Sequence, residues 1–239
     1  MSLAPQWDHL DNRLLAALPP DIFAVLERDL TDVTLEQGTV LFEPGAPIER
    51  VYFPQTGMIS LLIITGGDML EITAIGHEGA AGLQRGLGER LSFTRATVQV
   101  TGRFSVIGAA RFEQIVGGSA PVRDLIAQYS ELLCAEAQQT AACNALHDAS
   151  SRLCRWLLQT ADRLDSDLVP LTQEFMSHML GVRRTTLTLL ARTLQNKRAI
   201  RYTRGRIRIV DRALLEACAC ECYRVIQHDA LPGRIGVKL

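Results

Sequence analysis

The sequence feature that most constrains the fold is an uninterrupted stretch over residues 122–147. It contains neither glycine nor proline, and a run of this length without a helix breaker predicts a single long helix. Small or apolar side chains recur along it every seven positions, which is typical of a seam along which two helices pack. We therefore expect one long helix that separates an N-terminal part of the chain from a C-terminal part.

The seven-residue repeat also predicts what this helix does. A seam with small residues on its second row suits close approach of a second copy of the helix, so we expect a parallel homodimer in which the polar Gln139 helps to set the register. The alternative is that the same stripe packs against the β part of its own chain. The predicted interface residues are Leu125, Leu132, Ala135, Gln139, Ala142 and Leu146.

Residues 31–120 have the pattern of a β domain. Short runs rich in Val, Ile and Thr alternate with turn signals such as Pro44-Gly45 and Gly66-Gly67-Asp68. Many short strands at close spacing predict a sandwich or roll. Residues 19–30 and 109–116 carry the apolar spacing of short amphipathic helices.

Composition excludes several other classes of protein. The 239 residues are 47% hydrophobic and 21% charged, which is typical of a folded globular chain. No apolar run approaches the roughly 18 residues of a membrane helix, and the first residues lack the order of a signal peptide. We expect a cytoplasmic protein without a membrane partner, whose six cysteines are thiols because they are too few for a disulfide framework.

Charge is distributed very unevenly along the chain. Residues 170–212 contain ten Lys or Arg and two Asp or Glu, a net charge of +8, although the whole chain carries only −1. A basic segment inside an acidic chain predicts binding to a polyanion, and nine of the ten cations are arginine, which forms forked contacts with phosphate and guanine. A solvated basic face without a partner is the alternative.

The basic segment also contains a helix-turn-helix pattern. Thr172 can cap a first helix, Gly181 stands where a sharp turn is needed, and a second helix follows with an apolar face. Residues 199–210 then alternate, with Ile207 and Ile209 on one side and Arg206 and Arg208 on the other, as in a wing hairpin. Alternatively, these arginines only keep the edge of the hairpin solvated and prevent it from pairing with other strands.

This arrangement predicts two sets of DNA contacts. The second helix of such a motif enters the major groove with its first turns, so Arg184, Thr185 and Thr188 are the predicted base-reading residues. Contacts with phosphates add affinity without sequence choice. The predicted phosphate contacts are Thr172, Gln173, Arg183, Arg192, Arg204, Arg206 and Arg208.

Taken together, these motifs resemble the Crp/Fnr family of bacterial transcription regulators over nearly the whole chain. Residues 40–45 (Val-Leu-Phe-Glu-Pro-Gly) and the later Val-Tyr-Phe at 51–53 look like the cyclic-nucleotide-binding-type β-roll of that family. The resemblance implies an α+β fold with a β-roll (jelly roll) sensor domain over residues 1–118, a dimerisation helix over 119–148 and a winged helix-turn-helix domain over 149–239. It also implies double-stranded DNA and RNA polymerase as partners.

The sequence departs from this family where an effector would bind. Effector-binding members place an adjacent Gly-Glu pair, and an Arg followed by a small hydroxyl residue, around a cyclic phosphate. The corresponding residues here are Glu78, Gly79, Arg95, Ala96 and Thr97. His77 separates Gly76 from Glu78, so this stretch has no adjacent Gly-Glu pair, and Ala96 holds the hydroxyl position. We expect an unknown effector other than cyclic AMP, and an operator that differs from the best-known palindrome, because Thr185 and Leu189 replace charged residues of well-known members.

No cofactor or metal is expected. The iron–sulfur members of the family use N-terminal cysteines, and residues 1–133 contain none. Cys218, Cys220 and Cys222 stand at two-residue spacing, which on a helix would point them to different faces, and they are not the Cys-x-x-Cys pairs of a zinc site. Packing is the favoured interpretation of these cysteines, and redox sensing is the alternative.

The function predicted by the sequence is therefore that of a DNA-binding regulator and not of an enzyme. The chain has no Gly-x-Ser-x-Gly elbow, no His-Glu-x-x-His and no phosphate loop ending in Gly-Lys-Ser/Thr. The alternative is a signalling module, responsive to a cyclic nucleotide or to redox state, whose basic domain binds RNA or a protein.

Overall fold

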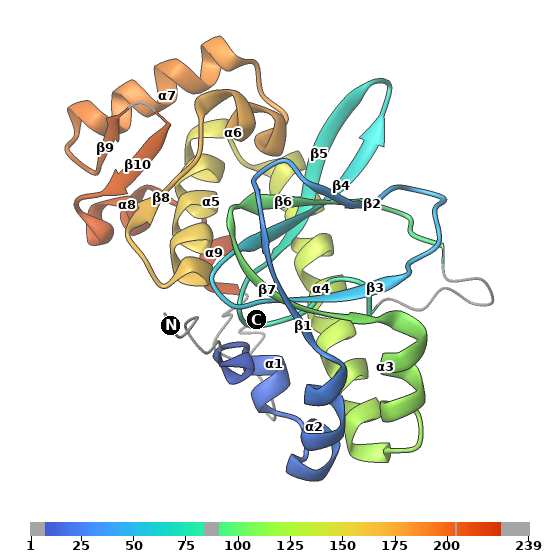
Figure 1. Cartoon of the computed structure of the whole chain (residues 1–239). Coiled ribbons are helices and arrows are strands. Elements are labelled where there is room, and N and C mark those ends of the chain that lie inside the picture. Colours follow the sequence, from blue (N-terminus) through green and yellow to red (C-terminus); the bar gives the residue numbers. More distant parts are fainter. Residues whose placement is uncertain (1–7, 84–90, 204, 226–239) are drawn as a thin grey trace.

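The computed structural model of the chain describes residues 8–83, 91–203 and 205–225 (Figure 1). A β domain, a long helix and a C-terminal helical domain with a small sheet follow one another along the chain. This confirms the predicted α+β fold with a β-roll, a long helix and a winged helix-turn-helix.

The β domain consists of two antiparallel sheets that enclose an apolar core. Inward-facing side chains such as Phe53, Ile59, Ile75 and Phe104 are fully buried there, as alternation along half-buried strands requires. The strand order is β1-β7-β3 in one sheet and β2-β6-β4-β5 in the other. The strands are β1 (Thr31–Leu35), β2 (Val40–Phe42), β3 (Arg50–Pro54), β4 (Met58–Thr65), β5 (Asp68–Ile75), β6 (Arg95–Val100) and β7 (Gly102–Gly108).

Short helices close one end of the β domain (Figure 1). The helix predicted over 19–30 is confirmed in a shorter form, because α2 (Pro20–Leu26) ends in the 3-10 turn η2 (Glu27–Asp29). The helix predicted over 109–116 is α3 (Ala109–Val116), and it packs against α2. The remaining helices of this end are η1 (His9–Asp11) and α1 (Arg13–Ala16).

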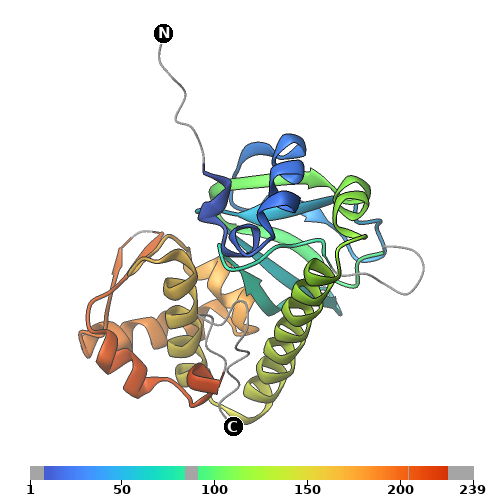
Figure 2. The same cartoon turned by 90° about the horizontal axis from the view of Figure 1, so that it is seen from below.

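The long helix α4 (Ala120–Leu146) runs along one side of the molecule (Figure 2). Its Val122, Leu125, Tyr129 and Leu133 are buried in the core of the β domain. The Tyr129 hydroxyl donates to the Ala80 carbonyl and accepts from the Ala80 amide. The alternative interpretation of the seven-residue repeat was packing against the chain's own β domain. The structure shows this packing for the face of α4 that carries these residues.

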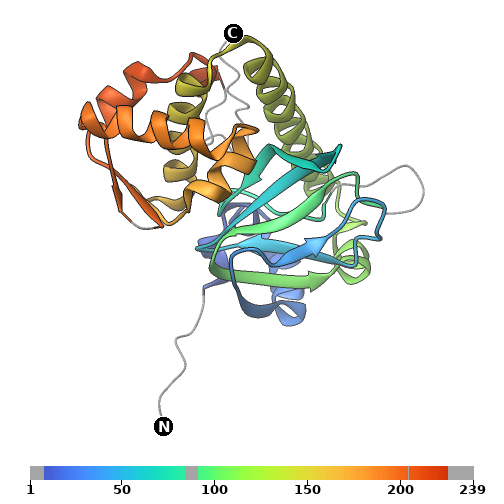
Figure 3. The same cartoon turned by 90° about the horizontal axis from the view of Figure 1, so that it is seen from above.

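The C-terminal domain is a helical bundle with a three-stranded sheet (Figure 3). Its first helix begins after Asp148, whose side chain accepts hydrogen bonds from the Ser150 and Ser151 amides, and ends at Asp165 in a left-handed conformation (φ 48°). Its core includes Met58 and Leu62 of the β domain. The elements are α5 (Ala149–Leu164), β8 (Leu168–Val169), α6 (Gln173–Leu180), α7 (Arg184–Asn196), β9 (Ile200–Thr203), β10 (Arg206–Ile209), α8 (Arg212–Cys218) and α9 (Cys222–Val225).

A buried ion network joins the three parts. Arg163 of α5 contacts Glu78 of the β domain (Nε to Oε1, 3.2 Å) and Glu136 of α4 (3.0 Å), and all three side chains are more than nine-tenths buried. Burial alone lowers the pKa of Arg163, but the carboxylates of Glu136 and Glu78 outweigh this effect and raise it above its ordinary value. Thr73 donates a short hydrogen bond to Glu136, so β5 also takes part.

Replacing Arg163 by Met should destabilise the chain strongly. Two carboxylates would then be buried without their cation, which costs about 3–5 kcal/mol of unfolding free energy. Urea denaturation followed by circular dichroism measures this loss. The matched control is Arg111→Met, because Arg111 pairs with Asp29 at the surface, where solvent screens the pair and its loss should change stability little. Equal losses in both variants would contradict the prediction.

Candidate nucleic-acid interface

The helix-turn-helix is formed by α6, a short turn and α7. The Thr172 hydroxyl accepts a hydrogen bond from the Phe175 amide (3.2 Å) and so caps α6, as predicted. Gly181 ends α6 in the left-handed region (φ 61°), which glycine adopts without the steric cost that a Cβ adds. α7 then packs through Leu187, Ala191 and Leu194, which are buried.

The predicted base-reading residues lie together on the outer face of α7. Arg184, Thr185 and Thr188 are exposed and occupy its first two turns. The Thr188 hydroxyl lies 2.9 Å from both Gln173 Oε1 and the Arg184 carbonyl, so it links α7 to the start of α6. Leu189 is 65% exposed on the same helix. Sequence reasoning did not select it, although an apolar residue on an otherwise polar face was a usable signal.

The wing has the predicted alternation. β9 and β10 pair antiparallel, with Ile207 opposite Tyr202 and Arg208 opposite Arg201. Ile207 and Ile209 are buried, and Arg206 and Arg208 are exposed. The strand β8 adds to the other side of β10 and completes the sheet.

The candidate phosphate contacts lie at the start of α6, on α7 and on the wing strand β10. Arg183, Arg192, Arg206 and Arg208 are exposed, as is Thr172, while Gln173 is partly exposed; Arg204 lies outside the described residues. Three further cations of the basic segment are also exposed, although the sequence analysis did not name them individually as phosphate contacts. They are Lys197, Arg198 and Arg201.

The first turn of α7 faces a hairpin of the β domain. Arg183 and Arg184 line a cleft of about 810 Å³ together with Thr65, Gly67 and Asp68 of the β4–β5 hairpin. α6 packs directly on β5 (Figures 1 and 3). The position of the helix-turn-helix is therefore fixed partly by the β domain.

Comparison with known proteins agrees with this geometry. Residues 151–218 match the sequence family of the Crp-like helix-turn-helix domain. The chain has the Crp/Fnr fold. FixK2 from Bradyrhizobium japonicum is 15% identical with a TM-score of 0.69, over 80% of this chain and 98% of that one. A crp/fnr-family transcriptional regulator from Eubacterium rectale is 16% identical with a TM-score of 0.65, over 87% and 98% of the two chains.

A third solved structure is the c-di-GMP responsive global regulator CLP of Xanthomonas campestris. It is 15% identical with a TM-score of 0.63, over 80% of this chain and 99% of that one. Identities this low show a shared fold and carry no information about a shared ligand. No curated protein matches the chain in sequence. Among the described residues, no helix is both long and apolar enough to cross a membrane.

The predicted effector residues of this Crp/Fnr fold do not converge on one pocket. Glu78 accepts hydrogen bonds from the Gly76 amide and from Arg163, and is buried. Gly79 lies against α4, because a Cβ there would fall 2.1 Å from the Tyr129 hydroxyl. Glycine is needed at this position for packing, and the turn is held against α4 instead of lining an open site.

The other three candidates lie along β6. The Arg95 guanidinium forms a forked pair with Glu43, with both N···O distances 2.8 Å. Ala96 is fully buried, and the Thr97 hydroxyl donates to the Thr39 carbonyl. A cavity of about 260 Å³ lies elsewhere, between the β domain and α4, and none of the five predicted residues lines it. Its lining includes Ile48, Leu61, Ile72, Leu91, Phe93 and Leu133.

The predicted dimer residues lie on more than one face of α4. Leu125 and Leu132 are buried within the chain, Ala135 and Gln139 are half-buried, and Ala142 and Leu146 are exposed. A different row of residues forms the exposed stripe of α4 and also follows a three-and-four spacing. It consists of Asp124, Ala127, Glu131, Cys134, Gln138, Ala141 and Ala145.

The expectation that the C-terminal cysteines point to different faces was wrong. Cys220 and Cys222 lie together with Cys143 and His147, and only Cys218 stands apart. The spacing argument assumed one continuous helix, but α8 ends at Cys218 and Ala219 is extended (φ −77°, ψ 153°). Because the chain leaves the helix after Cys218 and starts α9 only at Cys222, the rotation between neighbouring residues of one continuous helix does not apply to Cys220 and Cys222.

Replacing Gly181 by Ala should weaken the C-terminal domain. The left-handed conformation costs a residue with a Cβ about 1–2 kcal/mol, and the new Cβ would approach Leu70 Cδ1 at 3.0 Å. Urea denaturation measures the loss. Gly118→Ala is the matched control, since a Cβ there meets nothing within 4 Å; if the control loses as much stability as Gly181→Ala, the conformational argument fails.

Proposed function

We propose that this chain is a sequence-specific DNA-binding transcription regulator of the Crp/Fnr type, which acts as a homodimer on a palindromic operator. The observation that carries the proposal is the outer face of α7 and the wing, where exposed arginines and hydroxyls cluster within a domain that matches the Crp-like helix-turn-helix family. RNA polymerase is the further partner that such a role implies.

Each residue of this face has a defined role in the proposal. Arg184, at the start of α7, is the candidate for forked contact with the O6 and N7 atoms of guanine. Thr185 and Thr188 are placed for base edges, and Leu189 for the methyl group of thymine. The phosphate contacts are assigned to Thr172, Gln173, Arg183, Arg192, Arg206 and Arg208, with Arg204 added from the sequence alone.

The arginine contacts can be tested by substitution. Arg184→Ala should cost about 1–3 kcal/mol of binding free energy per half-site and relax the preference at one base pair, because it removes a base contact. Arg206→Ala should weaken binding to all sequences alike and lower the salt slope by about one unit, because it removes a phosphate contact. Selection on randomised duplexes, followed by titration at several salt concentrations, separates the two effects.

The control for both variants is Arg111→Ala, an exposed arginine of the β domain that pairs with Asp29. Its DNA affinity should be unchanged. An Arg184→Ala protein that keeps the full sequence preference of the wild type would remove that residue from base reading. Equal affinity for RNA and DNA duplexes would favour the alternative, a signalling module whose basic domain binds RNA.

The structure supports an effector other than a cyclic nucleotide. Arg95, which the family resemblance places against a cyclic phosphate, is held by Glu43. The cavity between the β domain and α4 is lined mostly by apolar side chains, so the effector we propose for it is a small apolar molecule.

The exposed stripe of α4 is the surface that we propose as the homodimer interface. Leu125 and Leu132 are already buried within one chain, whereas Ala127, Cys134 and Ala141 are exposed at the spacing of a helix seam. The proposed interface therefore lies on a neighbouring face of the helix from the one that the seven-residue repeat suggested.

Ala141→Arg should convert the dimer into monomers. A long charged side chain would be placed at a seam where two helices approach closely, and burying it without a partner is unfavourable. Light scattering of the purified protein gives the mass. Ala110→Arg, on the exposed face of α3, is the control and should remain dimeric, while a dimeric Ala141→Arg protein would place the interface elsewhere.

A further inference from the structure

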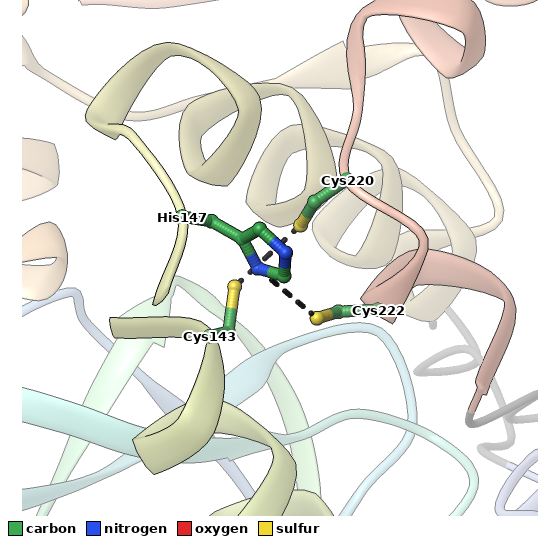
Figure 4. Close-up of side chains that lie close together, drawn as sticks. All are labelled: Cys143, His147, Cys220 and Cys222. Atoms are coloured by element: carbon green, nitrogen blue, oxygen red, sulfur yellow. Dashed lines mark hydrogen bonds between the residues drawn. The ribbon is translucent and has the colours of Figure 1, made fainter. Parts of the chain in front are cut away.

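Four side chains with metal-binding atoms converge beside the junction of α4 and α5. They are Cys143, His147, Cys220 and Cys222, and their ligand atoms all lie within 4.8 Å of one another (Figure 4). Cys143 and His147 come from the end of α4, one turn apart, whereas Cys220 lies between α8 and α9 and Cys222 is the first residue of α9. Two segments that lie far apart in the sequence thus supply two ligand residues each.

Two of the distances between ligand atoms are close to the edge length of a tetrahedral site. Cys143 Sγ lies 3.5 Å from Cys220 Sγ, and Cys222 Sγ lies 3.4 Å from His147 Nδ1. Zinc–sulfur bonds of about 2.3 Å in tetrahedral geometry place neighbouring sulfur atoms about 3.8 Å apart. A cation at the centre would therefore need only small shifts of the four side chains.

The cluster is closed to solvent on its sulfur side. Cys143, Cys220 and Cys222 are all buried and form an apolar cluster of their own, separate from the two main cores. Three cysteines and one histidine are a common ligand set for structural zinc. Because four protein ligands complete a tetrahedron, such a site leaves no open position for catalysis.

Neighbouring groups suit coordination as well. Gln139 Nε2 donates to Cys222 Sγ (2.9 Å), and His147 Nε2 lies 3.1 Å from Glu221 Oε1 while its Nδ1 faces the cysteines. A carboxylate on the far nitrogen of a histidine orients that ring toward a metal. Burial raises the pKa of the Cys143 thiol, and the nearby positive charge of Arg155 acts in the opposite direction and favours the thiolate.

We propose that Cys143, His147, Cys220 and Cys222 bind one thiophilic divalent cation, of which Zn²⁺ fits best, and that this cation fastens the segment 219–225 to the α4–α5 junction. Binding replaces the three thiol protons, which are released to solvent, and leaves the imidazole neutral. The proposed role of the site is structural, because the cation would fix the α4–α5 junction, where the C-terminal domain begins. It does not depend on the proposed DNA-binding function.

The test uses the purified, reduced full-length chain, stripped with a chelator and titrated with Zn²⁺ and with Co²⁺. We expect one cation per chain by elemental analysis. Bound Co²⁺ should show the intense visible bands of a tetrahedral centre and the sulfur charge-transfer bands of thiolate ligands. X-ray absorption of the zinc form should give three sulfur neighbours and one nitrogen neighbour.

Substitutions assign the ligands. Cys220→Ser and Cys143→Ser should each raise the zinc dissociation constant at least about 100-fold, because each removes a coordinating thiolate. Cys218→Ser is the matched control, since Cys218 lies in the same part of the chain but outside the cluster, and should bind zinc like the wild type. Where a ligand variant fails to fold, the X-ray absorption of the wild type still decides the ligand set.

Hydrogen exchange tests the structural consequence. Zinc should slow amide exchange at the end of α4, at the start of α5 and in residues 219–225, and leave the β domain unchanged. The proposal is overturned if the reduced chain takes up no zinc, if zinc binds equally to Cys220→Ser and the wild type, or if the purified protein carries a Cys143–Cys220 disulfide that persists under reducing conditions.

Discussion

The structure depends above all on one buried arginine. Arg163 sits near the end of α5 between Glu78 of the β domain and Glu136 of α4. A buried charge is very unfavourable without a counter-charge, so the three elements can pack only in an arrangement that brings both carboxylates to this guanidinium. The network adds little net stability beyond what apolar packing would supply, but it specifies one relative position of the β domain, α4 and α5.

Close backbone contacts reinforce this position. The His77 ring nitrogen Nδ1 lies 2.8 Å from the Arg163 carbonyl. Gly76 allows the approach, because a Cβ there would fall 2.8 Å from Arg163 Cβ. The turn at 76–79 is therefore held between α4 and α5 by its backbone and by Glu78. Residues 76–79 correspond in sequence to the phosphate-binding turn of effector-binding family members. These contacts explain why they instead connect the β domain with α4 and α5.

A second set of polar contacts positions the end of the described chain. Arg212 donates to the Tyr223 hydroxyl (2.8 Å), and that hydroxyl donates to Asp162 of α5 (3.0 Å). Burial, with the nearby carboxylate of Asp162, raises the pKa of Tyr223 to about 12, so the hydroxyl keeps its proton. These contacts fasten α8 and α9 to α5 and so bring Cys220 and Cys222 beneath the end of α4. The cysteine–histidine cluster is a consequence of this docking.

Local pattern was sufficient for most of the elements and for the exposed side of the helix-turn-helix, although it did not name the strands β1 and β8 or the helix α1. Apolar spacing, the cap at Thr172, the turn at Gly181 and the alternation of the wing are properties of neighbouring residues, and each predicted the structure correctly. Pairing between distant residues was decided only by tertiary structure. Arg95 meets Glu43, Leu125 enters the β core, and Cys143 meets Cys220 across 77 residues, because which buried faces meet is determined by packing and charge compensation over the whole chain and not by the spacing within any one segment.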